Sequence, residues 1–275
     1  MAVPIEPHQP NTGMAPTGEL TLTPRPWLSV IIPARNEEAY LPKLLDTLES
    51  ARSRYGGKPE EIEFIVVDNV STDETTRVAE AWGCRVVTVE TRNIGAVRNG
   101  GARAAQGEIF FFVDADLQMH PETFNEVAKA LADPTTVGGC MGMQWDRWSL
   151  ALAVSDVFGR VLEFVKRRPM GGGGTTFCRR DDFYAVGGYC EAHFGGEDIR
   201  IIKALQDYGA EQGRPNFVCL RRAKAIVSTR KMSYYGDWHL LRYGFRFVAI
   251  WLFAPKKARD WARPLWKEYW YGDHR

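Results

Sequence analysis

Acidic side chains stand at the ends of two predicted strands and at the start of one predicted helix. Asp114 and Asp116 follow the apolar run 109–113 directly, with Ala115 between them. Two hard oxygen donors held close together suit Mg²⁺ or Mn²⁺, particularly when a phosphate supplies the remaining ligands. A bare Asp-X-Asp triplet is common in solvated turns. Its position after an entirely apolar strand is what makes this one a candidate metal site.

Two further acidic positions are candidates for binding and for proton transfer. Asp68 ends the apolar run 62–67, where a carboxylate would accept hydrogen bonds from a base or a sugar, although an acid at this place also caps helices. Glu197 and Asp198 follow two glycines and open a predicted helix, whose N-terminus favours acids on electrostatic grounds alone. The same pair could present a general base. The residues by themselves leave both interpretations open.

The elements that must position these acids alternate along the chain from residue 27 onward. Apolar runs of strand length are followed by segments of helical period, which is typical of an α/β sheet built from strand-helix units. The expected strands are 28–32, 62–67, 84–89, 109–113 and 137–141. The expected helices are 37–53, one between 71 and 83, 94–105, 121–131, 148–167 and one from 197. Ligands of open α/β sheets bind at the carboxyl ends of strands, which is where the acids lie.

Five segments, in this order along the chain, resemble the family 2 glycosyltransferases with the GT-A fold. They are 30–38, 66–73, 93–102 with 107–108, 112–116, and 187–189 with 195–198. Each segment is weak evidence alone, but five in the correct order are specific, and the resemblance covers roughly residues 27–230. It implies a Rossmann-like, mixed, mostly parallel sheet flanked by helices. It also implies an inverting enzyme that moves a sugar from a nucleoside diphosphate to an acceptor hydroxyl, with Mn²⁺ or Mg²⁺.

The resemblance also implies roles for single residues of the donor site. The loop after the first strand and the acid after the second hold the nucleoside, which makes candidates of Pro33, Ala34, Arg35, Glu37 and Asp68. Arg98 corresponds to a basic position near the diphosphate or the base.

For the metal and the chemistry, the resemblance implies a second set of residues. Asp116 corresponds to the usual metal ligand, and Asp114 to an acid that assists at the ribose or the metal. Asp198 corresponds to the general base and Glu197 to a neighbour that orients the base or the acceptor. Arg230 resembles a basic residue that closes over the diphosphate, and a solvated strand end is an equally good interpretation.

Two departures from the family pattern leave the substrates open. Asn69 replaces a commonly acidic position, and segment 170–175 is unusually rich in glycine. The donor is expected to be a UDP-hexose first and GDP-mannose second. A sugar-phosphate nucleotidyltransferase is an alternative, but 33–37 lacks the glycine-rich basic loop of that class. A non-catalytic nucleotide- or glycan-binding relative is another, but binding alone requires no base.

Composition limits the function classes and the compartment. The 275 residues include 35 Lys and Arg against 34 Asp and Glu, a balance that disfavours a nucleic-acid binder. Five cysteines without any Cys-X-X-Cys pair favour a reducing compartment over a disulfide framework or a zinc site. The expected location is the cytoplasm, with the inner face of a membrane as a variant. Residues 1–26 are proline-rich and are predicted to be a flexible leader to a catalytic domain over 27–231.

The C-terminal extension, 232–275, differs from the rest of the chain. It holds 13 of the 33 aromatic residues and carries a charge of +4, while the remainder carries −3. An apolar stripe at alternating spacings of three and four predicts an amphipathic helix: Trp238, Leu241, Phe245, Val248 and Leu252. A broad aromatic face with flanking cations predicts peripheral membrane contact through 238–259, which would favour a lipid-linked or polysaccharide-precursor acceptor. Docking on the catalytic domain or on a dimer mate is the alternative, and the oligomeric state is left open.

Overall fold

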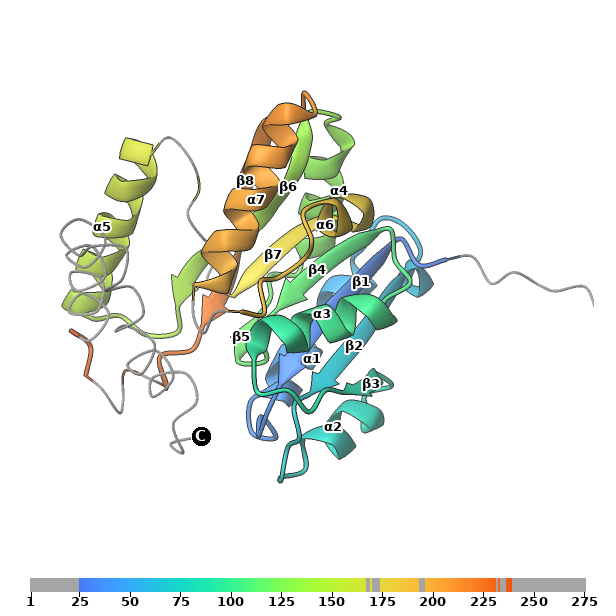
Figure 1. The fold of residues 1–275 in the computed structure, drawn as a ribbon. Helices are drawn as coiled ribbons and strands as arrows, with labels where there is room; N and C mark the ends of the chain where they lie inside the picture. The colour runs from blue at the N-terminus through green and yellow to red at the C-terminus, as the bar shows by residue number, and fades with distance from the viewer. Residues whose placement is uncertain are drawn as a thin grey trace, which may run out of the picture.

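The structure is a computed structural model that describes residues 25–166, 169, 174–192, 196–230, 232 and 236–238 (Figure 1). Nearly all of the predicted leader lies outside these residues. The predicted membrane-contact segment 238–259 also lies outside them, apart from Trp238. No helix within the described parts of the chain has the length and apolarity needed to cross a membrane.

Within the described residues, eight strands form one sheet in the order β3-β2-β1-β4-β7-β6-β8-β5. Their bounds are β1 Leu28–Ala34, β2 Ile62–Asp68, β3 Arg85–Thr88, β4 Ile109–Val113, β5 Leu117–Gln118, β6 Thr136–Trp145, β7 Thr175–Arg179 and β8 Asn216–Val227. Strands β1 to β4 are parallel to their neighbours among themselves, as are β6 and β8. Strand β7 is antiparallel to both β4 and β6, and β5 is antiparallel to β8. The sheet is therefore mixed and mostly parallel, as predicted.

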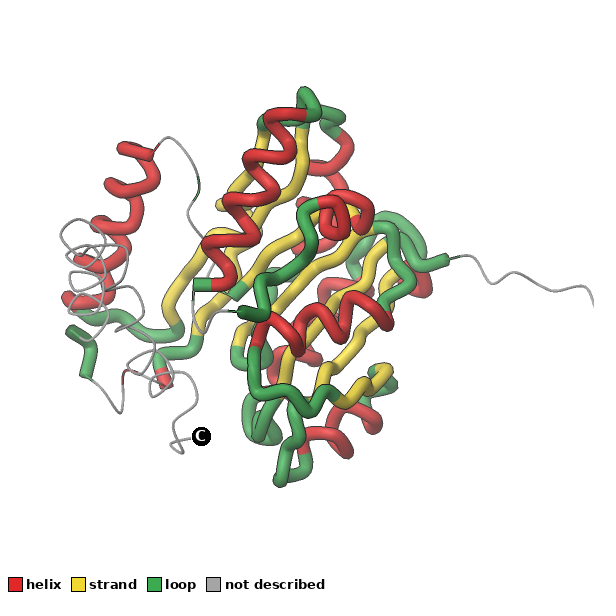
Figure 2. The backbone as a smooth tube through the Cα atoms, viewed as in Figure 1, coloured by secondary structure: helices red, strands yellow, loops and turns green. Residues whose placement is uncertain are grey.

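Helices cover both faces of the sheet. Helices α1 (Leu41–Ser53), α2 (Thr75–Ala81) and α4 (Thr123–Ala132) pack on one face, and α3 (Ile94–Ala104), α6 (Arg180–Ala185) and α7 (Glu197–Glu211) pack on the other. Because side chains alternate along a strand, Val30 and Ile32 of β1 join the first core and Ile31 joins the second. Helix α5 (Leu150–Lys166) stands apart from both layers, beyond the end of the sheet that holds β6 and β8 (Figures 1 and 2).

The structure differs from the sequence-based expectation at several places, for physical reasons. The first helix begins at Leu41, later than the predicted residue 37, because the amides of Asn36 and Glu37 donate to side chains that follow β2. The second helix, Thr75–Ala81, lies within the predicted range 71–83. Strand β7 and helix α6 were not predicted, since a five-residue run after a glycine segment has no clear period. Strand β7 forms by pairing with β4 and β6, which lie far away in the sequence.

Candidate active site

The predicted site residues gather at the carboxyl ends of β1, β2 and β4, together with the start of α7 and the end of β8. Two arginines divide most of the acids between them. Arg98, from α3, holds Asp114 and the Glu197-Asp198 pair. Arg230, just after β8, holds Glu37 and Asp116. The two acids that follow β4 are thus paired with different cations.

Arg98 is the centre of the first cluster and is only 2% exposed. Its Nη2 lies 2.7 Å from Asp114 Oδ1, and its Nη1 lies 2.8 Å from Asp198 Oδ1 and 3.2 Å from Glu197 Oε1. The guanidinium also stacks over the ring of Tyr189, 5.1 Å from its centroid. One buried cation therefore faces three carboxylates, which leaves an excess of negative charge in this part of the site.

Asp198 is the most accessible acid of this cluster. Its side chain is crowded by protein atoms yet keeps 35% of its surface in solvent, while Glu197 keeps 9%. Burial, with the charges of Glu197 and Asp114, raises the pKa of Asp198 to about 7 against the opposing effect of Arg98. A carboxylate that is accessible and titrates near neutrality is suited to accept a proton from a substrate hydroxyl.

Two asparagines of segment 93–102 hold the turn that carries Tyr189. Asn93 caps α3 by accepting a hydrogen bond from the Ala96 amide at 3.1 Å, and its Nδ2 donates to the carbonyl of Glu191 at 3.0 Å. Asn99 accepts from the Tyr189 amide and donates to the Tyr189 carbonyl, each at 2.9 Å. These residues of the family-like segment therefore act by placing the aromatic ring beneath Arg98.

Gly174, the last glycine of segment 170–175, supports Asp114. Its carbonyl accepts a hydrogen bond from the Asp114 amide at 3.0 Å, and its φ is +83°. A Cβ at this position would lie 2.8 Å from Cγ of Asp114, closer than real Cβ contacts allow. The backbone of Gly174 thus packs directly against the Asp114 side chain and fixes its position.

Substitution of Gly174 should distinguish a loss of stability from a loss of transfer activity. Gly174→Ala is expected to lose more than about 1 kcal/mol of stability, because alanine at positive φ is strained, and to lower transfer more than tenfold, because it displaces Asp114. Gly213→Ala is the matched control: its φ is +71°, but no atom lies within 4 Å of the added Cβ. Both variants should lose thermal stability in a melting experiment, and only the first should lose transfer. Equal transfer by the two would contradict the role of Gly174.

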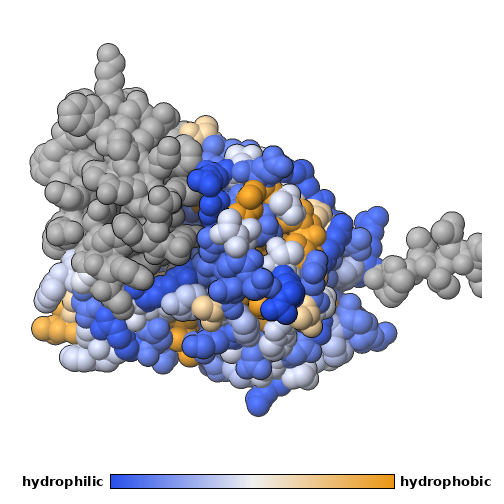
Figure 3. All heavy atoms as spheres, turned by 90° about the horizontal axis from the view of Figure 1, so that it is seen from below, coloured by the Kyte–Doolittle hydropathy of each residue, from blue (hydrophilic) through white to orange (hydrophobic). Residues whose placement is uncertain are grey.

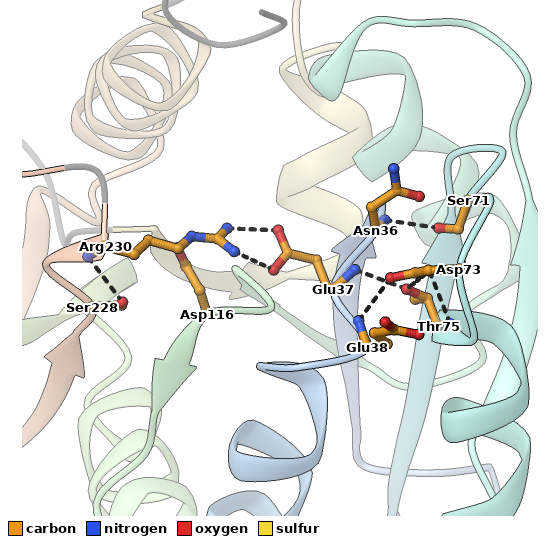
Figure 4. Close-up of polar contacts among 9 residues, drawn as sticks. All are labelled: Asn36, Glu37, Glu38, Ser71, Asp73, Thr75, Asp116, Ser228 and Arg230. Atoms are coloured by element: carbon orange, nitrogen blue, oxygen red, sulfur yellow. Dashed lines mark hydrogen bonds and ion pairs between the residues drawn. The ribbon is translucent and has the colours of Figure 1, made fainter. Parts of the chain in front are cut away.

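Arg230 is the centre of the second cluster (Figure 4). It binds the Glu37 carboxylate with both Nη atoms, at 2.6 and 2.7 Å, and its Nε lies 3.0 Å from Asp116 Oδ2. The guanidinium stacks 4.4 Å from the ring centroid of Tyr40. Its side chain is 17% exposed, so it sits at the edge of the site and not in the open solvent.

The loop that carries Glu37 is locked to the loop after β2. The amide of Glu37 donates to Thr75 Oγ1 at 2.8 Å, and the amide of Glu38 donates to Asp73 Oδ2 at 3.1 Å (Figure 4). Asn36 adopts a positive φ of 53°, a conformation that asparagine tolerates better than most residues. These bonds explain why α1 begins later than predicted, and they hold Glu37 pointing toward Arg230.

The predicted nucleoside-binding residues are mostly engaged with the backbone. Asp68 is 6% exposed and accepts a hydrogen bond from the Ser71 amide at 3.1 Å. Arg35 Nη1 donates to the carbonyl of Asn69 at 3.1 Å. Pro33 and Ala34 are buried at the end of β1, and Ala115 is buried between the two acids. These residues form one side of the candidate site, and Arg35 is the long, partly exposed side chain among them.

The structure gives a local reason for Asn69. Its Nδ2 donates to two carbonyl oxygens after β3, that of Val89 at 2.6 Å and that of Thr91 at 3.1 Å. A carboxylate in the same place would face both oxygens without a proton to share. The asparagine therefore ties the ends of β2 and β3 together.

The donor set fits a divalent cation that takes its other ligands from a substrate. The side chains of Asp114 and Asp116 are 30% and 18% exposed, so both reach solvent. Among the described residues, no group of three or more His, Cys, Asp or Glu could hold a metal by itself. Two carboxylate oxygens completed by phosphate oxygens match the coordination of Mg²⁺ or Mn²⁺. Asp116 would exchange its contact with Arg230 Nε for the ion.

Several residues of the site could not be identified from the sequence alone. Tyr40 and Tyr189 each stack on one of the arginines, and Gly174 supports Asp114. Tyr189 was within a recognised segment, but nothing in the sequence placed its ring under Arg98. Tyr40 carries no signal, because its partner is 190 residues away along the chain.

Comparison with known proteins identifies the family of this chain. The family described as "Glycosyl transferase family 2" matches residues 29–184. The chain is 35% identical over 133 residues to the undecaprenyl-phosphate 4-deoxy-4-formamido-L-arabinose transferase of Pseudomonas paraeruginosa, covering 44% of this chain and 38% of the relative. It is 33% identical over 145 residues to the validoxylamine A glucosyltransferase of Streptomyces hygroscopicus subsp. limoneus, covering 49% and 31%. The match thus spans less than two fifths of either relative.

Solved structures show the same fold. TarS of S. aureus matches with a TM-score of 0.59 at 18% identity, covering 88% of this chain and 80% of the TarS chain. The mannosyltransferase PcManGT of Pyrobaculum calidifontis, in complex with GDP-Man and Mn²⁺, matches with a TM-score of 0.56 at 23% identity, covering 72% and 55%. Since the family match spans more than half of the chain and the sheet has the shared architecture, this protein belongs to glycosyl transferase family 2, as a glycosyltransferase with the GT-A fold.

Proposed function

We propose that this chain transfers a sugar from a nucleoside diphosphate to an acceptor hydroxyl with inversion, and that the reaction depends on a divalent cation. The observation that carries the proposal is the position of Asp198 at the start of α7. It is accessible, is held by the arginine that also holds Asp114, and has a pKa raised to about 7. A general base and a candidate metal ligand therefore share one positioning residue.

The residues divide the reaction between them. Asp198 accepts the proton of the acceptor hydroxyl as its oxygen attacks the anomeric carbon, while the bond from that carbon to the diphosphate breaks. A single displacement of this kind inverts the anomeric configuration and needs no enzyme nucleophile. Arg98 acts as a positioning residue, because its Nη atoms are already bound to three carboxylates. Glu197, nearly buried beside it, orients the base.

Charge on the leaving group is stabilised by residues from both clusters. Asp116 and Asp114 are the residues that would hold Mg²⁺ or Mn²⁺, which supplies Lewis-acid stabilisation of the departing diphosphate. Arg230, once released from Asp116, is placed to contact the same diphosphate while Glu37 and Tyr40 keep it in position. The nucleoside would lie along the wall formed by 33–37 and Asp68.

Substitution of Asp116 should abolish the metal response. Asp116→Asn is expected to lower Mn²⁺-dependent release of the nucleoside diphosphate by about 10²–10³-fold, the usual effect of removing one electrostatic stabiliser of the transition state. Arg230 keeps its bidentate partner Glu37 in this variant, so the fold should persist. Asp46→Ala, an exposed acid on α1, serves as the control. Unchanged release across a Mn²⁺ titration, with and without EDTA, would remove the proposed metal role.

The relatives support a class of donor and a class of acceptor, and not one particular compound for either. Solved neighbours hold UDP-GlcNAc, GDP-Man with Mn²⁺, or UDP with Mn²⁺, which supports a UDP-hexose or GDP-mannose donor. The names of two relatives include undecaprenyl phosphate and poly(ribitol-phosphate), which supports a lipid-linked or polymeric acceptor. Incubation with a panel of nucleotide sugars and Mn²⁺, with release of the diphosphate as readout, selects the donor.

Membrane contact through the basic side chains of 238–259 is part of the same proposal, and it does not require the apolar stripe of that segment to enter the membrane. Arg242 and Arg246 lie four residues apart, so on a helix they share one face and would meet anionic headgroups there. The full chain is expected to float with vesicles that contain anionic lipid, and Arg242→Glu/Arg246→Glu to float several-fold less. Equal flotation of the two proteins would contradict membrane contact and leave the transferase proposal intact.

A further inference from the structure

Helix α5 carries an apolar face that no described residue covers. The face, here called the α5 stripe, consists of five residues at spacings of four and three: Leu150, Val154, Val157, Val161 and Phe164. Their exposed fractions range from 41% at Val154 to 84% at Phe164. A continuous stripe of five exposed apolar side chains is unusual on a surface that faces water. Elsewhere, the described surface seen in Figure 3 is mainly hydrophilic, with apolar residues in small separate patches.

Among the α5 side chains that the structure describes, only those of the first turn are anchored in the core. Ala151 and Leu152 are buried, whereas no residue between 153 and 161, nor Glu163 or Phe164, is buried. Beneath the helix, a cavity of about 560 Å³ separates it from the faces of β6 and β8, where Met143, Trp145 and Cys219 line it. A 17-residue helix gains most of its stability from packing an apolar face. Within the described part of the chain, the α5 stripe therefore has no partner that would hold this helix.

Thr229 and Asp237, near the end of the described part of the chain, lie close to the start of α5. Thr229 is held by Asp146, which accepts from its amide at 3.1 Å and from its hydroxyl at 2.6 Å. Arg147 donates from Nε to Thr229 Oγ1 at 3.0 Å and from Nη1 to Asp237 Oδ2 at 3.0 Å. Residue 238 consequently lies near the first turn of α5, and 37 residues follow it.

The segment that follows carries a matching apolar face. Trp238, Leu241, Phe245, Val248 and Leu252 alternate at spacings of three and four, the complement of the α5 stripe. A helix over 238–252 spans about 21 Å at 1.5 Å per residue, the same as the 14-residue separation of Leu150 and Phe164. Facing stripes with this alternation pack knobs into holes at a shallow crossing angle.

We infer that residues 238–252 form a helix that packs on the α5 stripe, parallel to α5 because both begin at the Arg147–Asp237 contact. Counted from Leu150 and Trp238, the first residues of the two stripes, Val157 and Phe245 both lie seven residues on, and Phe164 and Leu252 both lie fourteen residues on. Equal offsets therefore bring Phe245 opposite Val157 and Leu252 opposite Phe164. The packed face uses the apolar stripe of the tail and leaves Arg242 and Arg246 outside it. This inference concerns the architecture of the chain, so its failure would not affect the proposed transfer reaction.

Cysteine cross-linking in the full chain tests the inferred packing. Val157→Cys/Phe245→Cys should form an intramolecular disulfide on mild oxidation without lipid, at every protein concentration. Val157→Cys/Tyr243→Cys is the matched control, because Tyr243 is two residues from Phe245 and lies on the opposite side of a helix. The expected result is at least tenfold more intramolecular cross-link in the first protein, assigned by mass spectrometry of the linked peptides.

Three outcomes would overturn the inference. Equal cross-linking of the two pairs would show that the tail has no preferred face toward α5. Cross-links between chains, increasing with concentration, would show that a second copy covers the stripe. Protection of 238–252 from hydrogen exchange only when anionic vesicles are present, with no cross-link in their absence, would assign the tail to a membrane. Thermal melts of Val157→Asp, Phe245→Asp and the double variant give a second measure, since a shared contact predicts a combined loss smaller than the sum.

Discussion

Asp198→Asn is expected to lower kcat by about 10²–10⁴-fold while leaving donor binding nearly unchanged. The asparagine has the size of the aspartate and can accept a hydrogen bond from Arg98, but it cannot take the proton of the acceptor. Single-turnover transfer to the acceptor, combined with the donor affinity from a thermal-shift titration, separates the chemical step from binding. Transfer as fast as that of the wild type would show that the base is another group.

The pH profile of the same two proteins gives a sharper test. Asp198 is active as a base only when it is deprotonated, and burial raises its pKa to about 7. The kcat/KM of the wild type should therefore rise with pH up to about 7 and level off above it. The residual activity of Asp198→Asn should show no such rise. A rise in both proteins at the same pH would assign the titration to a different group.

Glu197→Gln is the matched control for the base. Glu197 is adjacent in sequence, binds the same Arg98 and is only 9% exposed, so it has little access to an acceptor. Its substitution is expected to lower kcat by less than the substitution of Asp198 and to keep the rise with pH. If Glu197→Gln were the more damaging change, the roles of the two acids would have to be exchanged.

Arg98→Met should be the most destabilising substitution in the site. It removes the buried cation that is shared by three carboxylates, of which Glu197 is buried and Asp114 and Asp198 are partly exposed. Breaking a buried ion pair by removing one partner typically costs about 3–5 kcal/mol. For a domain of this size, a loss of this magnitude lowers Tm by roughly 10 °C. Calorimetry at neutral pH measures the change. Arg103→Met, an exposed arginine on the same helix, is the control and should lie within about 0.5 kcal/mol of the wild type.

The loss in Arg98→Met should depend on pH in a defined direction. Without the guanidinium, which opposes the rise in the pKa of Asp198, burial and the neighbouring carboxylates of Glu197 and Asp114 raise the pKa of Asp198 further above its value in the unfolded state. The folded variant then binds more protons than the unfolded chain, so its stability falls as pH increases. The deficit relative to the wild type should be smaller at pH 5 than at pH 8. A deficit independent of pH would show that packing on Tyr189, and not charge, is the main role of Arg98.

Much of the fold was predictable from local patterns. Apolar runs such as 109–113 are long, uniform and bounded by polar residues, so they identify buried strands without knowledge of their neighbours. The acids at the ends of these strands then follow, because parallel strands end at one edge of the sheet. Strand β7 and helix α6 could not be predicted, since β7 depends on its pairing with β4 and β6 for its existence.

The sequence by itself determined which chemical groups are present and at which end of the sheet they stand: the carboxylates of Asp68, Asp114, Asp116 and Asp198, and the arginines that resemble family positions. Only the tertiary structure decided how they are paired. Arg98 and Asp114 are separated by a helix and a strand, and Arg230 and Glu37 by 193 residues, so no spacing rule connects them. The number of acids around each arginine sets the charge balance of the site. That balance, and with it the elevated pKa of Asp198, arises from burial and distance in the folded chain and is absent from the order of the residues.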